Sequence, residues 1–242
     1  FQIDNSKYKE FELADIEGEL KYKEDKLFIE QFVLNDNGYE ISGSADLSFS
    51  DSTPYLEAEL STNNLDYKYI KEKAVHFGIG NLEDMDIPLT GNLKAELKLI
   101  GDFDAPQISG NISSTNTNIN IAQKEITTDN IFLAFNLNKE RALELKNLEI
   151  KKGESKLNFS GLISEENYDL TYKGQNLDFS KLGLASFLNV KLEAVANLTG
   201  TIKGNLQSPK ITGDLSLEDI VYQQNNLENI KANYLYNNGD LK

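Results

Sequence analysis

The fold prediction depends on LKAELKLIGDFDAPQISGNI, residues 93–112, and on LTGTIKGNLQSPKITGDLSL, residues 198–217, which has glycine and proline at the same spacing. Both stretches contain a glycine, a proline five residues later, and then Ile-x-Gly. These residues are Gly101, Pro106, Ile108 and Gly110 in the first stretch, and Gly204, Pro209, Ile211 and Gly213 in the second. The offset is constant, since 204 − 101 and 213 − 110 are both 103. A pattern that returns at a fixed offset indicates a repeated structural unit.

Alternation of apolar and charged residues explains what this unit is. Apolar residues occupy every second position of the first stretch, at Leu93, Ala95, Leu97 and Leu99. A period of two places alternate side chains on opposite faces of a β-strand. Pro106 and Pro209 fix φ and lack an N–H donor, which suits a turn or the first residue of a strand. The sequence therefore predicts two strands joined by a proline-containing turn.

Composition limits the classes of function. The net charge is −15, which argues against nucleic acid, because binding to phosphates depends on Lys and Arg. There is no Cys, so disulfides and thiolate sites are excluded. No run approaches the roughly 18 apolar residues of a membrane-spanning helix. We interpret the chain as one continuous segment of a longer protein.

The rest of the chain continues the strand pattern. We expect roughly 16–20 strands of about 5–7 residues, in an all-β fold. Two stretches differ, because Asn-Leu-Asp at residues 64–66 and 176–178 precedes helical spacing at residues 67–77 and 179–188. Asp66 is a suitable N-cap for the first short helix. The repeat units then run approximately over residues 1–90, 91–189 and 190–242, the last being incomplete.

This order of motifs resembles the TamB family, within the AsmA-like bridge-type lipid-transfer proteins of the bacterial envelope. The resemblance rests on Asn-Leu-Asp before a short helix, on Gly-Asn-Leu-Lys or Leu-Thr-Gly-Thr-Ile-Lys-Gly, and on Pro-x-Ile-x-Gly. It implies a long, strongly curved, mostly antiparallel sheet folded into an apolar-lined groove, called a β-taco. It also implies a periplasmic segment of an inner-membrane-anchored protein, phospholipid or another acyl-chain ligand, and a BamA-like outer-membrane barrel as partner.

A sheet of this kind has a simple way to carry lipid. Strands of about six residues give a sheet about 20 Å wide, comparable to an acyl chain, and each buried CH₂ gains about 0.8 kcal/mol. The candidate lining residues are the alternating apolar ones, Leu93, Ala95, Leu97, Leu99, Ile108, Ile112, Ile131, Leu133, Phe135, Leu198, Ile202, Ile211, Leu215 and Leu217. An ordinary β-sandwich would instead bury the same side chains against each other.

Two other functions are compatible with the pattern. One is a chaperone-like scaffold that accepts strands of outer-membrane proteins by β-augmentation. The other is a carbohydrate-binding or adhesive β-solenoid that uses its polar face. Enzyme chemistry is not indicated, because His76 is the sole histidine and no catalytic set surrounds the Asp84/Asp86 or Asp102/Asp104 pairs. We predict no metal and no cofactor.

Overall fold

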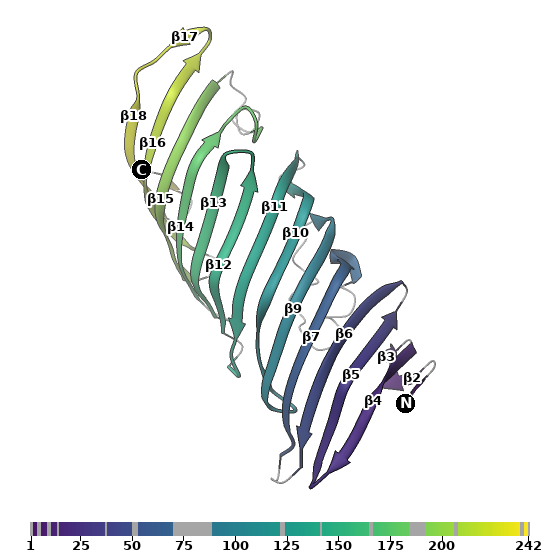
Figure 1. Cartoon of the computed structure of the whole chain (residues 1–242). Helices are drawn as coiled ribbons and strands as arrows, with labels where there is room; N and C mark the ends of the chain where they lie inside the picture. Colours follow the sequence, from purple (N-terminus) through teal and green to yellow (C-terminus); the bar gives the residue numbers. More distant parts are fainter. Residues whose placement is uncertain are drawn as a thin grey trace. The chain divides into compact units, whose positions relative to one another are not determined.

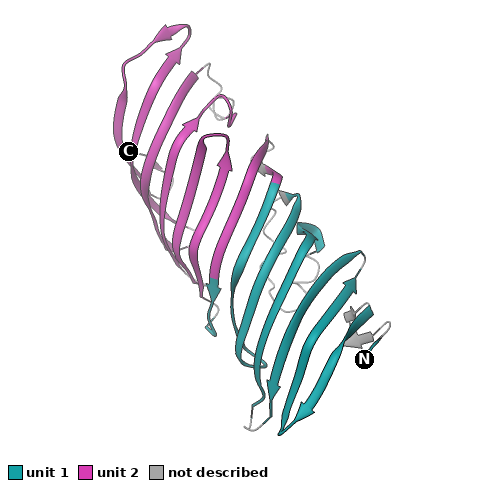
Figure 2. Ribbon diagram, viewed as in Figure 1, with its two compact units in different colours: residues 1–115, 136–140 teal, residues 116–135, 141–242 magenta. Residues whose placement is uncertain are grey.

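The computed structural model describes residues 2–3, 6–8, 11–13, 15–36, 38–49, 53–69, 89–121, 124–140, 142–164, 167–183, 192–205, 208–237 and 240–241. Nineteen strands lie in these ranges (Figure 1). The chain forms two compact units, shown in different colours in Figure 2. Unit 1 comprises Phe1–Thr115 and Asn136–Glu140, and unit 2 comprises Asn116–Phe135 and Arg141–Lys242.

The strands of unit 1 are β1 (Gln2–Ile3), β2 (Ser6–Tyr8), β3 (Phe11–Leu13), β4 (Asp15–Lys23), β5 (Lys26–Asp36), β6 (Tyr39–Ser48), β7 (Tyr55–Asp66), β8 (Leu89–Thr90) and β9 (Asn92–Asp102). Two strands contribute residues to both units, β10 (Gln107–Ile121) and β11 (Lys124–Leu137). Unit 2 contains β12 (Leu143–Lys152), β13 (Ser155–Ile163), β14 (Asn167–Asp178), β15 (Leu192–Asn205), β16 (Lys210–Tyr222), β17 (Asn225–Asn226), β18 (Ile230–Asn237) and β19 (Asp240–Leu241).

Both units are antiparallel sheets in which neighbours in sequence pair. In unit 1 the order is β1–β4–β5–β6–β7–β9–β10, and β2 and β3 form a separate ribbon. In unit 2 the order is β12–β13–β14–β15–β16–β18, with β17 beside β16 and β19 beside β18. Most of these pairs are joined by short reversals, whereas residues 67–91 separate β7 from β9 and residues 179–191 separate β14 from β15.

The repeated stretch forms the predicted strand pair in both places. In β9 and β10, Leu99 lies opposite Ile108, and in β15 and β16, Ile202 lies opposite Ile211. The glycine one residue before the end of each first strand has a positive φ, +127° at Gly101 and +103° at Gly204. A side chain is strained at such angles, which explains why glycine stands at this point in both copies.

The strands are longer than the sequence pattern predicted, and the expected length of about 5–7 residues is wrong. β5, β7 and β9 have 11, 12 and 11 residues, and β10 has 15. At about 3.3 Å per residue, an 11-residue strand spans about 36 Å. The prediction ended each strand where the alternation of apolar residues ended. Strand pairing is made by main-chain hydrogen bonds, so a strand can continue through polar residues. In β10, the Ser114 hydroxyl donates to the Asn92 carbonyl at 2.9 Å, and the strand continues through polar residues.

The first predicted helix begins where expected. Residues 67–69 form a helical turn directly after Asp66, whose carboxylate accepts the Tyr69 N–H at 2.6 Å. In the second copy Asp178 accepts the N–H groups of Ser180 and Lys181 at 3.0 Å, but residues 179–183 form hydrogen-bonded turns and not a helix. Glycine at position 183 disfavours helix there. The remaining predicted helical residues, 70–77 and 184–188, lie outside the described residues.

The sheet of each unit is open and curved, and its strands bend along their length (Figure 1). Bulges interrupt the register in both, between Ile29 and Phe32 in β5 and between Leu145 and Leu148 in β12. A bulge bends its strand and increases its twist. The predicted fold class is confirmed, since the chain is all-β and antiparallel with a curled sheet, as in a β-taco. Among the described residues, no second large sheet covers either one, so a two-layer sandwich is not formed.

Candidate functional site

Antiparallel pairing gathers the apolar side chains of unit 1 on one face. Directly opposite residues point to the same side of a sheet, so pairing extends a set across neighbouring strands as a row. One row consists of Phe32, Gly43, Leu60, Leu97 and Gly110. The next consists of Ile29, Ala45, Ala58, Leu99 and Ile108. We call this side the apolar face of unit 1, and the side that carries Glu96 and Lys98 the polar face.

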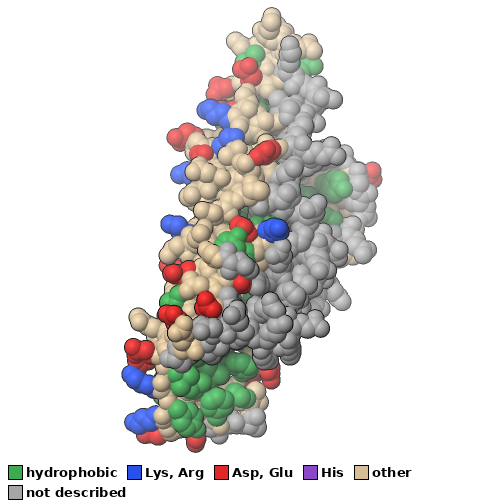
Figure 3. All heavy atoms as spheres, turned by 90° about the vertical axis from the view of Figure 1, so that its right-hand side faces the viewer, with side chains coloured by type: hydrophobic (Ala, Val, Ile, Leu, Met, Phe, Trp, Pro, Cys, Tyr) green, Lys and Arg blue, Asp and Glu red, His purple; other side chains and the backbone are tan. Residues whose placement is uncertain are grey.

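The apolar face of unit 1 is only partly buried. Two small clusters are closed, one around Ala45, Leu56 and Ala58 and one around Leu65, Tyr69 and Leu93. Of the residues predicted to line a groove, Leu93 and Ala95 are buried, with 9% and 7% exposed, and Leu97, Leu99, Ile108 and Ile112 are half-buried. In the space-filling view, hydrophobic side chains gather at the lower end of the molecule (Figure 3). The face therefore keeps apolar surface in contact with solvent.

One end of this face is fixed by a hydrogen-bonded cluster. The Tyr69 hydroxyl donates to Asp36 at 3.0 Å, and the Tyr39 hydroxyl donates to Asp66. The rings of Tyr39 and Tyr69 lie 4.4 Å apart between centroids. Hydrogen bonds from Tyr39 and from the Tyr69 N–H hold the pKa of Asp66 below its usual value, and burial raises the pKa of Tyr69. These bonds satisfy the carboxylates, so the cluster is structural.

The apolar face of unit 2 is built in the same way from three rows. The first row is Leu145, Gly161, Leu170, Ile202, Ile211 and Tyr236. The second row is Leu148, Phe159, Tyr172, Gly200, Gly213 and Tyr234. The third row is Ile150, Leu157, Gly174, Leu198, Leu215 and Ala232. The predicted lining residues in these strands are all half-buried, at Leu198, Ile202, Ile211, Leu215 and Leu217.

The predicted lining residues of β11 are less distinct. Ile131, Leu133 and Phe135 alternate along the strand and are half-buried. The intervening Phe132 and Ala134 are half-buried as well. Exposure therefore does not separate the two faces of this strand, in contrast to the first halves of β7 and β9, where exposed and buried residues alternate.

Several residues of these faces were not among the predicted lining set. Phe32 and Leu60 complete the row of Leu97, and Phe159, Tyr172 and Tyr234 complete the second row of unit 2. The alternation that marks residues 39–49, 55–60 and 157–163 as strands also marks their apolar phase. Pairing register is the missing information, because it decides which phase of one strand continues that of the next.

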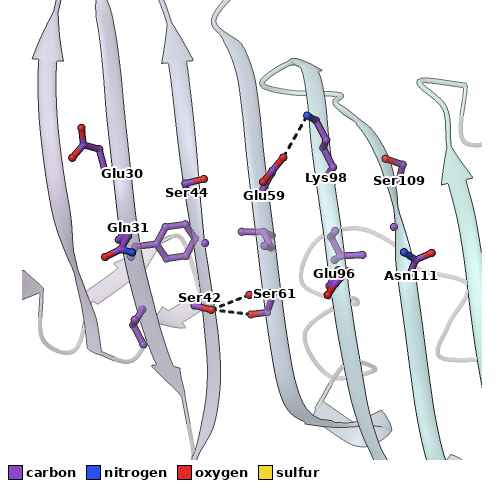
Figure 4. Close-up of a pocket in the computed structure, with 16 residues that line it drawn as sticks. Glu30, Gln31, Ser42, Ser44, Glu59, Ser61, Glu96, Lys98, Ser109 and Asn111 are labelled. Atoms are coloured by element: carbon purple, nitrogen blue, oxygen red, sulfur yellow. Dashed lines mark hydrogen bonds and ion pairs between the residues drawn. The ribbon is translucent and has the colours of Figure 1, made fainter.

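Unit 1 carries a furrow of about 760 Å³, lined by two rows of polar residues and by the row between them, which is Phe32, Gly43, Leu60, Leu97 and Gly110 (Figure 4). Its upper side is the row Ser44, Glu59, Lys98 and Ser109, and its lower side is the row Ser42, Ser61, Glu96 and Asn111. The Ser42 and Ser61 hydroxyls lie 2.9 Å apart, and Lys98 forms ion pairs with Glu57 and Glu59 at 3.1 and 3.5 Å. These paired groups are solvated, so the polar rows of the furrow have the character of an ordinary protein surface.

In the described ranges no group of three or more His, Cys, Asp or Glu side chains is arranged to hold a metal ion. Asp102 forms an ion pair with Lys139 at 2.8 Å, while His76, Asp84 and Asp86 lie outside the described residues. No helix in the described ranges is long and apolar enough to cross a membrane. What the apolar faces offer is surface that displaces water from an apolar ligand.

The comparisons with known proteins agree with the fold. A family model described as the N-terminal domain of TamB matches residues 4–239, almost the whole chain. Comparisons with curated proteins and with solved structures gave no match. On the strength of the family match, the chain belongs to the TamB family.

Proposed function

We propose that the apolar faces shield acyl chains of phospholipids, so that lipid moves between the inner and outer membranes along this segment. The observation that carries the proposal is the half-buried state of Leu97, Leu99, Leu198 and Leu215 in the middle of extended apolar rows. Membership of a transport and assembly family of the envelope supports the same function. In this proposal the segment is periplasmic, and its longer protein is anchored in the inner membrane and meets a BamA-like barrel.

Uniform lining gives the binding needed for transport. An acyl chain on such a face leaves water and gains up to about 0.8 kcal/mol for each buried CH₂. The rows contain aliphatic and aromatic side chains of similar chemistry, separated at some strands by glycine, so no single position binds much more strongly than the next. A ligand that is held at many weak points can move from one to another without leaving the face.

Charge on the apolar face tests the proposal. We expect Leu97→Glu in unit 1 and Leu215→Glu in unit 2 to abolish lipid co-purification, because an acyl chain would then have to desolvate a carboxylate. Both side chains are half-buried, so the added carboxylate keeps contact with water and the sheet stays folded. Ser109→Glu and Ser216→Glu place the same charge on the polar face and serve as matched controls. Mass spectrometry of the purified chain measures bound lipid.

Photo-crosslinkers at the same four positions identify the ligand. Lipid captured at positions 97 and 215 but not at 109 and 216 is the expected result. Captured polypeptide would instead favour a scaffold that accepts strands by β-augmentation. Glycan captured from the polar face would favour the carbohydrate-binding alternative. If the wild-type chain carries no lipid and its apolar positions capture none, the proposal is wrong.

A further inference from the structure

Two tyrosine hydroxyls meet within the apolar face of unit 2. Tyr172 of β14 and Tyr234 of β18 belong to one row, and β15 and β16 lie between their strands. Gly200 and Gly213 occupy the row at those two strands. The two hydroxyls hydrogen-bond to each other. The tyrosine side chains therefore bridge two positions that carry no side chain.

Glycine is required beneath this bridge. A Cβ added to Gly213 would lie 2.7 Å from the hydroxyl oxygens of both Tyr172 and Tyr234. A Cβ added to Gly200 would overlap the Thr212 carbonyl oxygen and the Tyr172 hydroxyl. The Tyr172 side chain, with 8% of the residue exposed, thus rests on the main chain of β15 and β16. It forms the floor of the apolar face at this row.

The hydrogens of the bridge can be assigned. A tyrosine hydroxyl has one hydrogen to donate, and a carbonyl oxygen can only accept. The Tyr172 hydroxyl lies 3.1 Å from the Thr212 carbonyl oxygen and donates to it. The bond between the two hydroxyls then uses the hydrogen of Tyr234. Burial, assisted by the hydrogen bond with Tyr234, raises the pKa of Tyr172, so this hydroxyl keeps its hydrogen at neutral pH.

We propose that Tyr172 and Tyr234 form a specificity-determining element, a hydroxyl pair in the apolar floor that has no hydrogen left for a ligand. The inference rests on the proposed function. An ester carbonyl of a phospholipid binds wherever an apolar surface offers an unpaired donor, since both groups are otherwise unsatisfied. Because both hydrogens are used within the protein, the ester passes this row without being held. In unit 1 the residue 103 positions before Gly200 is Leu97, which carries no hydroxyl.

Single hydroxyl deletions have opposite expected effects. Tyr172→Phe leaves the Tyr234 hydrogen without its partner, so it becomes a donor on the face. We expect a phosphatidylglycerol with one fluorescent acyl chain to leave this variant roughly fivefold more slowly, on transfer to phosphatidylcholine vesicles. Tyr234→Phe keeps the bond from Tyr172 to Thr212 and should release the probe at the wild-type rate. The double variant has no hydroxyl and should return to the wild-type rate.

Two controls separate ligand binding from loss of packing. A fluorescent diether lipid lacks ester carbonyls, so Tyr172→Phe should not slow its release. Ser216→Ala removes a hydroxyl from the opposite, polar face of β16 and should change neither rate. Three results would overturn this inference and leave the proposed function standing. They are equal slowing of the ester and ether probes, equal effects of the two single variants, and an unchanged rate in Tyr172→Phe. If the wild-type chain takes up neither probe, the proposed function fails and this inference fails with it.

Discussion

Gly110→Ala tests whether close approach of two strands shapes the apolar face. Gly110 of β10 lies opposite Leu97 of β9. A Cβ at this position would overlap the Glu96 carbonyl oxygen and would lie 2.7 Å from Cδ2 and 3.1 Å from Cα of Leu97. The Leu97 side chain can rotate away. The carbonyl oxygen and the Cα belong to the β9 main chain, so β9 and β10 must move apart.

The magnitude follows from two opposing terms. Forcing a methyl group into a packed site costs about 1–3 kcal/mol. Alanine in place of glycine restricts the unfolded chain, which stabilises the folded state by about 0.4–1 kcal/mol. We therefore expect Gly110→Ala to lower the free energy of unfolding by about 1–2 kcal/mol. For a chain of this size that corresponds to a decrease in Tm of about 2–8 °C.

Gly174→Ala is the matched control. Its Cβ would meet side-chain atoms only, Leu177 Cδ1 at 2.6 Å and Leu198 Cγ at 2.9 Å. Those side chains can adjust, so the change in unfolding free energy should stay within about 0.5 kcal/mol. Urea unfolding measures both variants, and amide hydrogen exchange shows whether protection falls in β9 and β10. Equal losses in the two variants, or unchanged protection of β9 and β10 in Gly110→Ala, would refute the reasoning.

The remaining predictions concern the capping carboxylates. Asp66→Ala removes the acceptor of the Tyr69 N–H and should cost about 1 kcal/mol in urea unfolding, whereas Asp66→Asn, which keeps an accepting oxygen, should cost less. Hydrogen bonds from Tyr39 and Tyr69 lower the pKa of Asp66, and those from Lys181 lower the pKa of Asp178, below the usual 3.8. A carboxyl group whose pKa is lowered by folding stabilises the folded state at pH values above its unfolded-state pKa. This contribution is lost as the pH falls through the folded-state pKa. The urea concentration at the unfolding midpoint should therefore decrease as the pH is lowered below about 4. The decrease should be smaller in an Asp66→Asn/Asp178→Asn variant. An equal decrease in the variant and the wild type would contradict the assignment.

Local patterns in the sequence were enough to predict the strand pair and the turn between its strands. Alternation at Leu93, Ala95, Leu97 and Leu99 reports which side of one strand is apolar, and Gly101 with Pro106 reports where the chain turns. The Asp66 cap is equally local, because its acceptor and donor are three residues apart. These features depend on residues close in sequence, so they can be read without knowledge of pairing.

Features that depend on register could not be predicted in the same way. Tyr172 meets Tyr234 across 62 residues, and the two come together because β14, β15, β16 and β18 pair in one particular register. A shift of one residue would turn Tyr234 to the polar face. The length of β10 was missed for a related reason, since its last residues are held by contacts with the next strand, such as the buried Thr128 hydroxyl, which donates to the Thr117 carbonyl at 3.0 Å.

Half-exposed apolar rows carry a cost that helps to interpret them. Apolar surface left in water forgoes about 25 cal/mol for each Å² that burial would remove. Leu97, Leu198 and Leu215 keep such surface, while Ala58 and Tyr172 in the same apolar rows or in neighbouring ones are buried. The half-exposed leucines therefore fit the proposed function, in which a ligand makes the contacts that the protein leaves open.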